Sequence, residues 1–425
     1  MTSGVTSPIW HPFTQHALQP EMIPISGARG AWLKTRDGGL ILDAISSWWV
    51  VTHGHCHPRI VGAIEEQARR LDQVIFAGFT HAPAEMLARG LIEMAPAGLA
   101  HVFYSDSGST AVEVALKMAL GYFRNIGAPR RRIVALEHGY HGDTVGGMSV
   151  GARGVFSAAY EPLLFDVARI PFPAEGREQA TIDAFDAACA TEPVAALIVE
   201  PLILGAGGMR IYSEHVLREL KRVAEAHGAL FIADEVMTGW GRTGAPFACG
   251  KAGIAPDILC TAKGITGGSL PLAATLCTSA IFEAHHSTDR TKTFFHSSSY
   301  TANPIACAAA VANLDIWQTE PMGERLAALA AMQAERLATL AGDDRFANAR
   351  QIGTITAIDL KVPDAGYLAG VGPRLARYFL EREVLLRPLG NTIYVMPPYC
   401  VSSADLDLVY AAIAEAPDAL AGGPS

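Results

Sequence analysis

The segment Ala229-Leu230-Phe231-Ile232-Ala233-Asp234-Glu235 consists of five apolar residues, typical of a buried strand, followed by two acids. A second apolar run, Asp257 to Ala262, ends on Lys263-Gly264. Ligands of open α/β sheets bind outside the carboxyl ends of the strands, so we expect Asp234 and Lys263 to face one pocket. The two strands therefore predict an α/β fold with an acid and an amine at the same sheet edge.

This pair of residues is what pyridoxal phosphate (PLP) needs from a protein. A lysine binds the cofactor covalently, and a carboxylate keeps its pyridine nitrogen protonated so that the ring accepts electrons. Each residue also has an ordinary interpretation, because an aspartate after a strand often caps a helix and a lysine there is usually a solvated charge. The segment Gly264-Ile265-Thr266-Gly267-Gly268 favours the cofactor, because glycines let the backbone approach a ligand closely.

The residues around this pair resemble a known family. The motif Asp234-Glu235-Val236-x-Thr238-Gly239-x-Gly241-Arg242-Thr243-Gly244, followed by Pro256-Asp257-Ile258 and Lys263-Gly264, is similar to the class III aminotransferases of PLP fold type I. The resemblance runs from the amino-terminal tryptophans to Arg387. It implies PLP as the cofactor, Asp234 and Lys263 as catalytic residues, and a homodimer with its active sites at the interface.

Composition narrows the possible partners. The chain has 425 residues, half of them hydrophobic, and a formal net charge of −9 without a basic stripe, which argues against nucleic acid. Its seven cysteines form no C-x-x-C pair, which favours a reduced, cytoplasmic environment. The apolar runs are too short to cross a bilayer. We therefore expect small-molecule substrates, with no nucleic acid and no membrane as a partner.

Strands and helices alternate from about residue 100 to residue 280, which predicts a mostly parallel sheet covered on both faces. An alternating run, Ile352 to Leu360, predicts a strand in a small α+β domain. The amino-terminal strands, joined by a hairpin turn at Asp37-Gly38-Gly39, are expected to complete that domain. The predicted division is residues 1–55 as an amino-terminal segment of the small domain, 56–318 as the large PLP-binding domain, and 319–425 as the rest of the small domain.

The segment Ser105-Asp106-Ser107-Gly108-Ser109 separates a short strand from a long helix. Free amides and the positive end of the helix dipole attract an anion, so Gly108 and Ser109 are predicted to hold the cofactor phosphate. A plain serine N-cap explains the same residues without a ligand. The resemblance further implies that Tyr140, in a Tyr-His-Gly turn at a strand end, stacks on the cofactor ring and contacts the substrate.

Three serines precede the helix that begins near Ile305. The segment Phe294 to Pro304 resembles the family's H-x-x-T-x-x-x-N-P motif, which reaches across the dimer to the partner's cofactor phosphate. Ser299 stands where the family has threonine and keeps the hydroxyl donor. The resemblance implies cofactor contacts for Ser298 and Ser299 and a substrate contact for Ser297, whereas the alternative is a surface that only packs.

Some side features resemble the subgroup of this family that serves biotin synthesis by aminating 8-amino-7-oxononanoate to 7,8-diaminononanoate. Trp48 and Trp49 are expected to lie on a strand and point to opposite faces, with Trp48 lining the substrate's hydrocarbon chain. Arg387, in Arg387-Pro388-Leu389-Gly390, is expected to clamp the substrate carboxylate through its bidentate fork. The alternatives are core packing for both tryptophans and a solvated surface for the arginine.

The first residues of the chain bear on the amino donor. S-adenosylmethionine is expected, but Phe13 stands where its users generally carry a tyrosine in the W-H-P-x-T motif. Losing one neutral hydrogen bond weakens donor binding by roughly tenfold, which does not exclude this donor. Lysine as the donor remains an alternative, as do other class III reactions on ornithine, 4-aminobutyrate or a β-amino acid.

A second class of function is suggested by His53-Gly54-His55-Cys56-His57-Pro58, where alternating histidines can ligate zinc. No further ligand cluster or H-E-x-x-H helix accompanies them, and the glycine and proline argue for a turn. A non-catalytic metal-binding protein is therefore the minor alternative to the enzyme.

Overall fold

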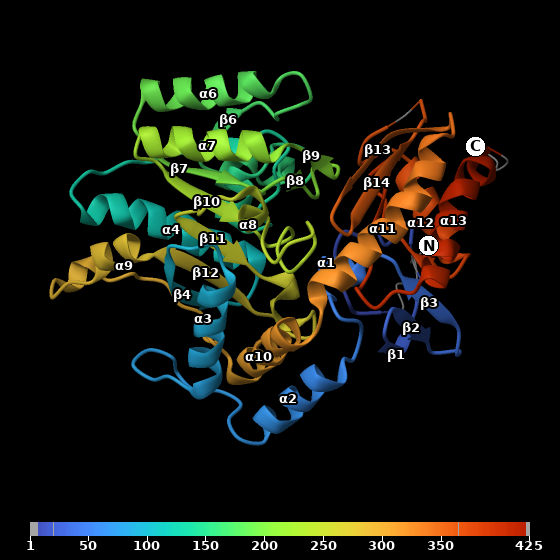
Figure 1. Cartoon of the computed structure of the whole chain (residues 1–425), viewed down its shortest axis with the longest axis horizontal. Helices are drawn as coiled ribbons and strands as arrows, with labels where there is room; N and C mark the ends of the chain where they lie inside the picture. Colours follow the sequence, from blue (N-terminus) through green and yellow to red (C-terminus); the bar gives the residue numbers. More distant parts are fainter. Residues whose placement is uncertain (1–6, 20, 364, 422–425) are drawn as a thin grey trace.

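The computed structural model describes residues 7–19, 21–363 and 365–421 of the chain. Its largest sheet has seven strands in the order β4-β12-β11-β10-β7-β5-β6 (Figure 1). The neighbouring pairs from β11 to β6 are parallel, and β12 is antiparallel to both of its neighbours. The predicted α/β class and mostly parallel sheet are thus confirmed. The strands are β4 (Leu99–Ser105), β5 (Arg132–Leu136), β6 (Ala168–Ile170), β7 (Val194–Val199), β10 (Leu230–Asp234), β11 (Ile258–Thr261) and β12 (Ala273–Thr278).

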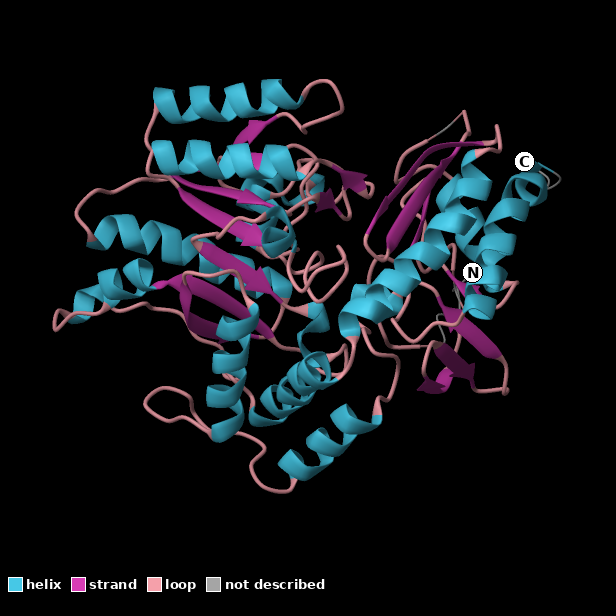
Figure 2. Cartoon of the chain, viewed as in Figure 1, coloured by secondary structure: helices cyan, strands magenta, loops and turns pink. Residues whose placement is uncertain are grey.

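Helices cover both faces of this sheet (Figure 2). In β10, Phe231 and Ala233 belong to the same apolar cluster as residues of α6 and α7, whereas Leu230 and Ile232 belong to a cluster with α4. Successive side chains of a strand point to opposite faces, so a strand buried on both sides is apolar throughout. The helices of this part are α2 (Pro58–Ala68), α3 (Ala82–Met94), α4 (Gly108–Asn125), α5 (Val145–Val150), α6 (Glu178–Thr191), α7 (Glu214–Ala226), α8 (Ala248–Ala252), α9 (Ser279–His285) and α10 (Pro304–Thr319).

The two ends of the chain build a second part together. A three-stranded antiparallel sheet, β13-β14-β16, lies beside a four-stranded sheet, β1-β2-β3-β15, and in Figure 1 the blue amino-terminal strands lie next to the red helices. In this second sheet β15 pairs in parallel with β3. The domain limits at residues 55 and 318 stay predictions. The elements are β1 (Ile25–Arg29), β2 (Trp32–Thr35), β3 (Leu40–Asp43), α11 (Met322–Ala341), β13 (Phe346–Ile352), β14 (Ile355–Leu360), α12 (Val371–Leu380), β15 (Val384–Leu385), β16 (Thr392–Val395) and α13 (Ser403–Ala421).

In this second part of the molecule, one predicted hairpin turn is present and one predicted strand is interrupted by a turn. The hairpin at Asp37-Gly38-Gly39 is present between β2 and β3. The prediction of one continuous strand from Ile352 to Leu360 was wrong, because β13 ends at Ile352 and β14 begins at Ile355. Gly353 turns the chain between them with a φ of 52°, a conformation that glycine adopts without steric cost. The alternating pattern therefore spans both sides of a hairpin.

The segment Ser46–Trp49, here called the tryptophan turn, also differs from the prediction. We expected an extended strand, but its four residues have φ values of 54°, 44°, 71° and 73°. The segment is therefore a left-handed turn, α1 in Figure 1. The carboxylate of Asp43 accepts hydrogen bonds from the backbone and the hydroxyl of Ser47. These local bonds favour a turn over a strand.

No helix within the described ranges is long and apolar enough to span a bilayer.

Candidate active site

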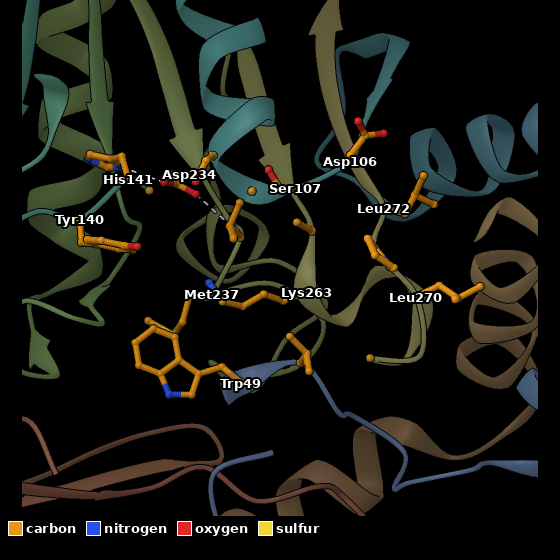
Figure 3. Close-up of a pocket in the computed structure, with 18 of the residues that line it drawn as sticks. Trp49, Asp106, Ser107, Tyr140, His141, Asp234, Met237, Lys263, Leu270 and Leu272 are labelled. Atoms are coloured by element: carbon orange, nitrogen blue, oxygen red, sulfur yellow. Dashed lines mark hydrogen bonds and ion pairs between the residues drawn. The ribbon is translucent and has the colours of Figure 1, made fainter. Parts of the chain in front are cut away.

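A cavity of about 440 Å³ opens at the carboxyl ends of the large sheet's parallel strands. Asp106 and Ser107 follow β4, Tyr140 to Gly142 follow β5, Glu200 follows β7, and Asp234 ends β10. Lys263 begins the short 3₁₀ turn η2 (Lys263–Thr266), just after β11. The predicted meeting of Asp234 and Lys263 at one sheet edge is confirmed, since both line this cavity (Figure 3).

Asp234 is held by a buried histidine. Its Oδ2 lies 2.7 Å from Nδ1 of His141, and its Oδ1 accepts a hydrogen bond of 3.2 Å from the amide of Val236. Burial alone would lower the pKa of His141, but the hydrogen bond to Asp234 and its charge outweigh burial and raise that pKa above its usual value. The raised pKa favours a protonated imidazole beside the carboxylate of Asp234.

Lys263 extends into the cavity above the ring of Trp49 (Figure 3), with Nζ 5.2 Å from the ring centroid. The amine takes part in none of the hydrogen bonds and ion pairs found among the described residues. Burial lowers the pKa of Lys263, while the charges of Asp234 and Glu200 oppose that shift. A buried amine with a lowered pKa is suited to act as a nucleophile and as a base.

The backbone around Lys263 is constrained. Lys263 has a φ of 45°, which is uncommon outside glycine and, at active sites, marks strain that the surrounding structure must hold. A side chain at Gly264 would come within 2.7 Å of Trp240. A glycine at 264 therefore also leaves room for the side chain of Trp240.

The start of α4 forms a shallow cradle on the cavity wall. Gly108 and Ser109 are its first residues, behind the N-cap Ser107, and the first amides of a helix have no partner within the helix. A side chain at Gly108 would lie 2.6 Å from Val236, and one at Gly142 would lie 2.1 Å from the hydroxyl of Ser109. Neither position has room for a side chain, so the backbone can lie this close at the cavity wall only with glycine at both, and free amides at a helix start can bind an anion.

Glu200 fixes the turn that carries Tyr140. Its two oxygens each accept a hydrogen bond of 2.9 Å, from the amides of Tyr140 and of Gly205. Burial raises the pKa of Glu200 to about 7, despite the nearby His141. Tyr140 lines the cavity and is thereby held against the ends of β5 and β7.

Three of the predicted substrate residues, Phe13, Trp48 and Arg387, lie against one another. The Arg387 guanidinium lies 4.5 Å from the ring centroid of Trp48, and the rings of Phe13 and Trp48 meet edge to face at 5.6 Å. Phe13 also meets Phe156, which lines a second cavity of about 340 Å³ that shares Tyr140 with the first. Trp49, not Trp48, lines the first cavity.

The serines at 297 to 299 do not line either cavity of their own chain. Ser297 and Ser299 are exposed, and the hydroxyl of Ser298 donates to the carboxylate of Asp106, which does line the first cavity. Their predicted contact with the cofactor of a partner subunit stays a prediction.

Several residues that line the site had no role predicted for them. His141 and Glu200 were visible only as polar residues after strands β5 and β7, and the strand ends were the one available signal. The histidine segment has separate partners: Nε2 of His53 lies 2.7 Å from Asn313, and Nε2 of His55 lies 2.8 Å from Asp43. No group of three metal-ligating side chains occurs among the residues whose structure is described.

Comparison with known proteins identifies relatives along nearly the whole chain. The family model for aminotransferase class III matches residues 13–416. The adenosylmethionine-8-amino-7-oxononanoate aminotransferase of Synechococcus elongatus is 47% identical over 416 residues, covering 96% of this chain and 97% of that protein. The protein of the same name from Geobacter sulfurreducens is 38% identical over 439 residues, covering 98% and 96%.

Solved structures agree with these relatives. The adenosylmethionine-8-amino-7-oxononanoate aminotransferase of Methanocaldococcus jannaschii superposes with a TM-score of 0.92 at 34% identity, over 97% of both chains. An amine transaminase from an uncultivated Pseudomonas species, in its PLP-bound form, superposes with a TM-score of 0.91 at 33% identity, over 96% of this chain and 98% of that one. The similarity therefore includes both the sheet with the cavity and the part built from the chain ends.

Proposed function

Because this chain belongs to the class III aminotransferases, we propose that it transfers an amino group to 8-amino-7-oxononanoate, forming 7,8-diaminononanoate for biotin synthesis. The observation that carries the proposal is the 47% identity over nearly the whole length to an enzyme named for this acceptor. The proposed donor is S-adenosylmethionine, and the proposed cofactor is PLP. The cavity supports that cofactor, because it is lined both by Lys263 and by Asp234, the carboxylate that His141 holds.

The residues present fit PLP. Lys263 would hold it covalently, the amides of Gly108 and Ser109 would hold its phosphate at the start of α4, and Tyr140 would lie against its ring. The glycines that keep this cradle open are the structural observation behind the fit. When bound, PLP supplies an electrophilic carbon and a ring that withdraws electrons from the substrate.

Each protein group then has a defined task. Asp234 would hold a proton on the pyridine nitrogen of bound PLP, and His141 orients Asp234 through their hydrogen bond. The amine of Lys263 would act as the general base that removes a proton from the substrate carbon. It would then act as the general acid that passes this proton on. Burial lowers the pKa of this amine towards the working pH. Proton transfer is most efficient when the pKa of the catalytic group lies near that pH.

The direct test mixes the purified enzyme with PLP, 8-amino-7-oxononanoate and either S-adenosylmethionine or lysine, and measures 7,8-diaminononanoate by mass spectrometry. We expect product with S-adenosylmethionine. Ornithine, 4-aminobutyrate and a β-amino acid serve as competing substrates in matched reactions. Turnover of one of these without turnover of the oxononanoate would refute the proposed acceptor while leaving the aminotransferase family intact.

Arg387→Ala is expected to raise the KM for 8-amino-7-oxononanoate by about ten- to a hundredfold, because a charge-assisted hydrogen bond contributes about 1.5 to 3 kcal/mol. The placement of Arg387 over Trp48 supports a role at the acceptor carboxylate. Arg382→Ala is the matched control, since Arg382 stacks on Tyr378 and pairs with Glu415 away from both cavities. Initial rates at varied acceptor concentration provide the measurement, and an unchanged KM would place the carboxylate elsewhere.

Phe13→Tyr is expected to improve turnover with S-adenosylmethionine by up to roughly tenfold, since one added hydrogen bond contributes about 0.5 to 1.5 kcal/mol. Phe13 lies edge-on to Trp48 and to Phe156, and Phe156 lines the second cavity. We expect a hydroxyl added at this ring to contact the bound amino donor. Phe282→Tyr, outside both cavities, is the control. The rates with S-adenosylmethionine and with lysine are compared for each variant. Turnover of the wild type with lysine alone would assign lysine as the donor.

The proposal includes a homodimer with its active sites at the interface. Two observations support this assembly. Ser297 and Ser299 are exposed and do not line the cavity of their own chain, so their hydroxyls are free to face a partner. Ser298, between them, donates a hydrogen bond to Asp106, which lines that cavity. Mass measurement in solution and complementation between a Lys263→Ala subunit and a Ser299→Ala subunit test it, because a shared site requires residues from both subunits.

A further inference from the structure

The tryptophan turn needs an external support. All four of its residues, Ser46 to Trp49, adopt positive φ values, and none is glycine. Left-handed backbone is unfavourable for L-residues because Cβ approaches the following carbonyl oxygen. A run of this kind persists only where surrounding contacts determine it. The contacts that surround this turn therefore indicate what it is for.

Asp43 supports the turn from its amino-terminal side. Its side chain is fully buried, and Oδ1 accepts hydrogen bonds from the amides of Ile45 at 3.3 Å and Ser47 at 2.9 Å. Its Oδ2 accepts from the hydroxyl of Ser47 at 2.8 Å and lies 2.8 Å from Nε2 of His55. Both oxygens of this buried carboxylate therefore accept hydrogen bonds. Three of the four bonds come from Ile45 and Ser47, at the start of the turn, and the fourth involves His55.

His55 anchors Asp43 to a different element. Its amide donates to the carbonyl of Gly30 at 2.7 Å, and its carbonyl accepts from the amide of Gly30 at 3.2 Å, which ties it to the end of β1. Gly54, just before it, has a φ of 97° and no room for a side chain, because a Cβ would lie 2.6 Å from Sγ of Cys400. The imidazole is therefore a fixed partner for the carboxylate.

The two tryptophans depend on the turn to different degrees. Trp49 has its own anchors, because its indole N–H donates to the hydroxyl of Tyr394 at 3.0 Å and its carbonyl accepts from Arg242 at 3.5 Å. The indole of Trp48 has none of the described hydrogen bonds and is set by the turn, by Arg387 and by Phe13. The orientation of Trp48 is thus the property that the Asp43 support controls most directly.

We propose that Asp43 and His55 are positioning residues for the acceptor: they hold the tryptophan turn left-handed so that Trp48 lies flat under Arg387. The inference rests on the proposed function in that it takes Trp48 and Arg387 as the wall for the oxononanoate. It also gives a task to the histidine segment, of which His55 is the member that reaches the turn.

The kinetic test compares three variants. His55→Ala is expected to raise the KM for 8-amino-7-oxononanoate by about tenfold while kcat changes by less than about twofold, because a displaced aromatic wall weakens binding. His55→Gln is expected to restore the wild-type KM, since its amide can donate to Asp43. His57→Ala, a neighbouring histidine without contact to Asp43, is the control and is expected to leave both constants unchanged. An unchanged KM in His55→Ala, or an equal rise in His57→Ala, overturns the proposal.

A double-mutant cycle tests whether His55 acts through Trp48. In a Trp48→Ala background, His55→Ala is expected to add no further rise in KM, because coupled residues are not additive. Fully additive effects overturn the proposal. Should His55→Ala fail to fold, Ser47→Ala at a half-buried position removes one bond to Asp43, and a wild-type KM in that variant overturns the proposal equally.

Crystal structures separate this inference from the proposed reaction. If the wild type does not turn over the oxononanoate, the proposed function fails, but the structures of the wild type and of His55→Ala still test the support. We expect the turn to keep its positive φ values in the wild type and in His55→Gln and to lose them at Ser47 and Trp48 in His55→Ala. A left-handed turn retained in His55→Ala overturns the proposal whatever the substrate.

Discussion

Lys263→Ala is expected to abolish repeated turnover, with a steady-state rate lowered by more than about 10³-fold, because one amine serves as both nucleophile and proton carrier. The fold should survive, since the side chain extends into a cavity and makes none of the described ion pairs. Product formation over many turnovers, measured by mass spectrometry, is the assay. Circular dichroism checks that the variant is folded.

The control for this change is Lys34→Ala, which removes an exposed lysine of β2. It is expected to retain the wild-type rate. A Lys263→Ala enzyme that continues to turn over near the wild-type rate would remove Lys263 from the mechanism, and the cavity would then need another amine.

Asp234→Asn is expected to leave the cofactor bound but to slow the reaction by about 10² to 10³-fold, as when one electrostatic partner of a reacting group is lost. An amide has nearly the same shape as the carboxylate and can still accept a bond from His141, so the cavity should persist. It carries no negative charge, however, and cannot keep a proton on the pyridine nitrogen. Single-turnover rates and the ratio of bound PLP to protein separate the two effects.

The matched control is Asp289→Asn, at an exposed residue that precedes a 3₁₀ turn and lines neither cavity. A near-normal rate in Asp234→Asn with PLP bound would refute the pairing of this carboxylate with the ring. Loss of bound PLP in the same variant would instead show that Asp234 acts in cofactor binding more than in the proton-transfer steps.

The large sheet and the positions of Asp234 and Lys263 could be predicted from the sequence, because apolar runs mark the strands and ligands bind at the carboxyl ends of parallel strands. Apolar runs end at Asp234 and just before Lys263, and the carboxyl ends of neighbouring parallel strands meet at one edge. The contact between His141 and Asp234 could not be predicted in this way. It joins the ends of β5 and β10, which lie on either side of β7, and no local pattern records that order.

The conformation of the tryptophan turn could not be predicted from the sequence for a different reason. Ser46 to Trp49 contains no glycine or asparagine, the usual signals of left-handed backbone, and its aromatics favour a strand. The conformation comes from the buried carboxylate of Asp43, four residues before Ser47, and from His55 on another element. Tertiary contacts thus override local preference at a place that borders the first cavity, which Trp49 lines.

The pairing of β15 with β3 has a consequence for how the protein is made. These strands come from opposite ends of the chain, so β3 leaves the ribosome long before its partner is synthesised. Its edge stays open during most of translation, and an open strand edge is a template for wrong pairing. Nascent chains that stall before residue 384 are therefore expected to keep an unfinished sheet and to depend on chaperones, even when the seven-stranded sheet is already complete.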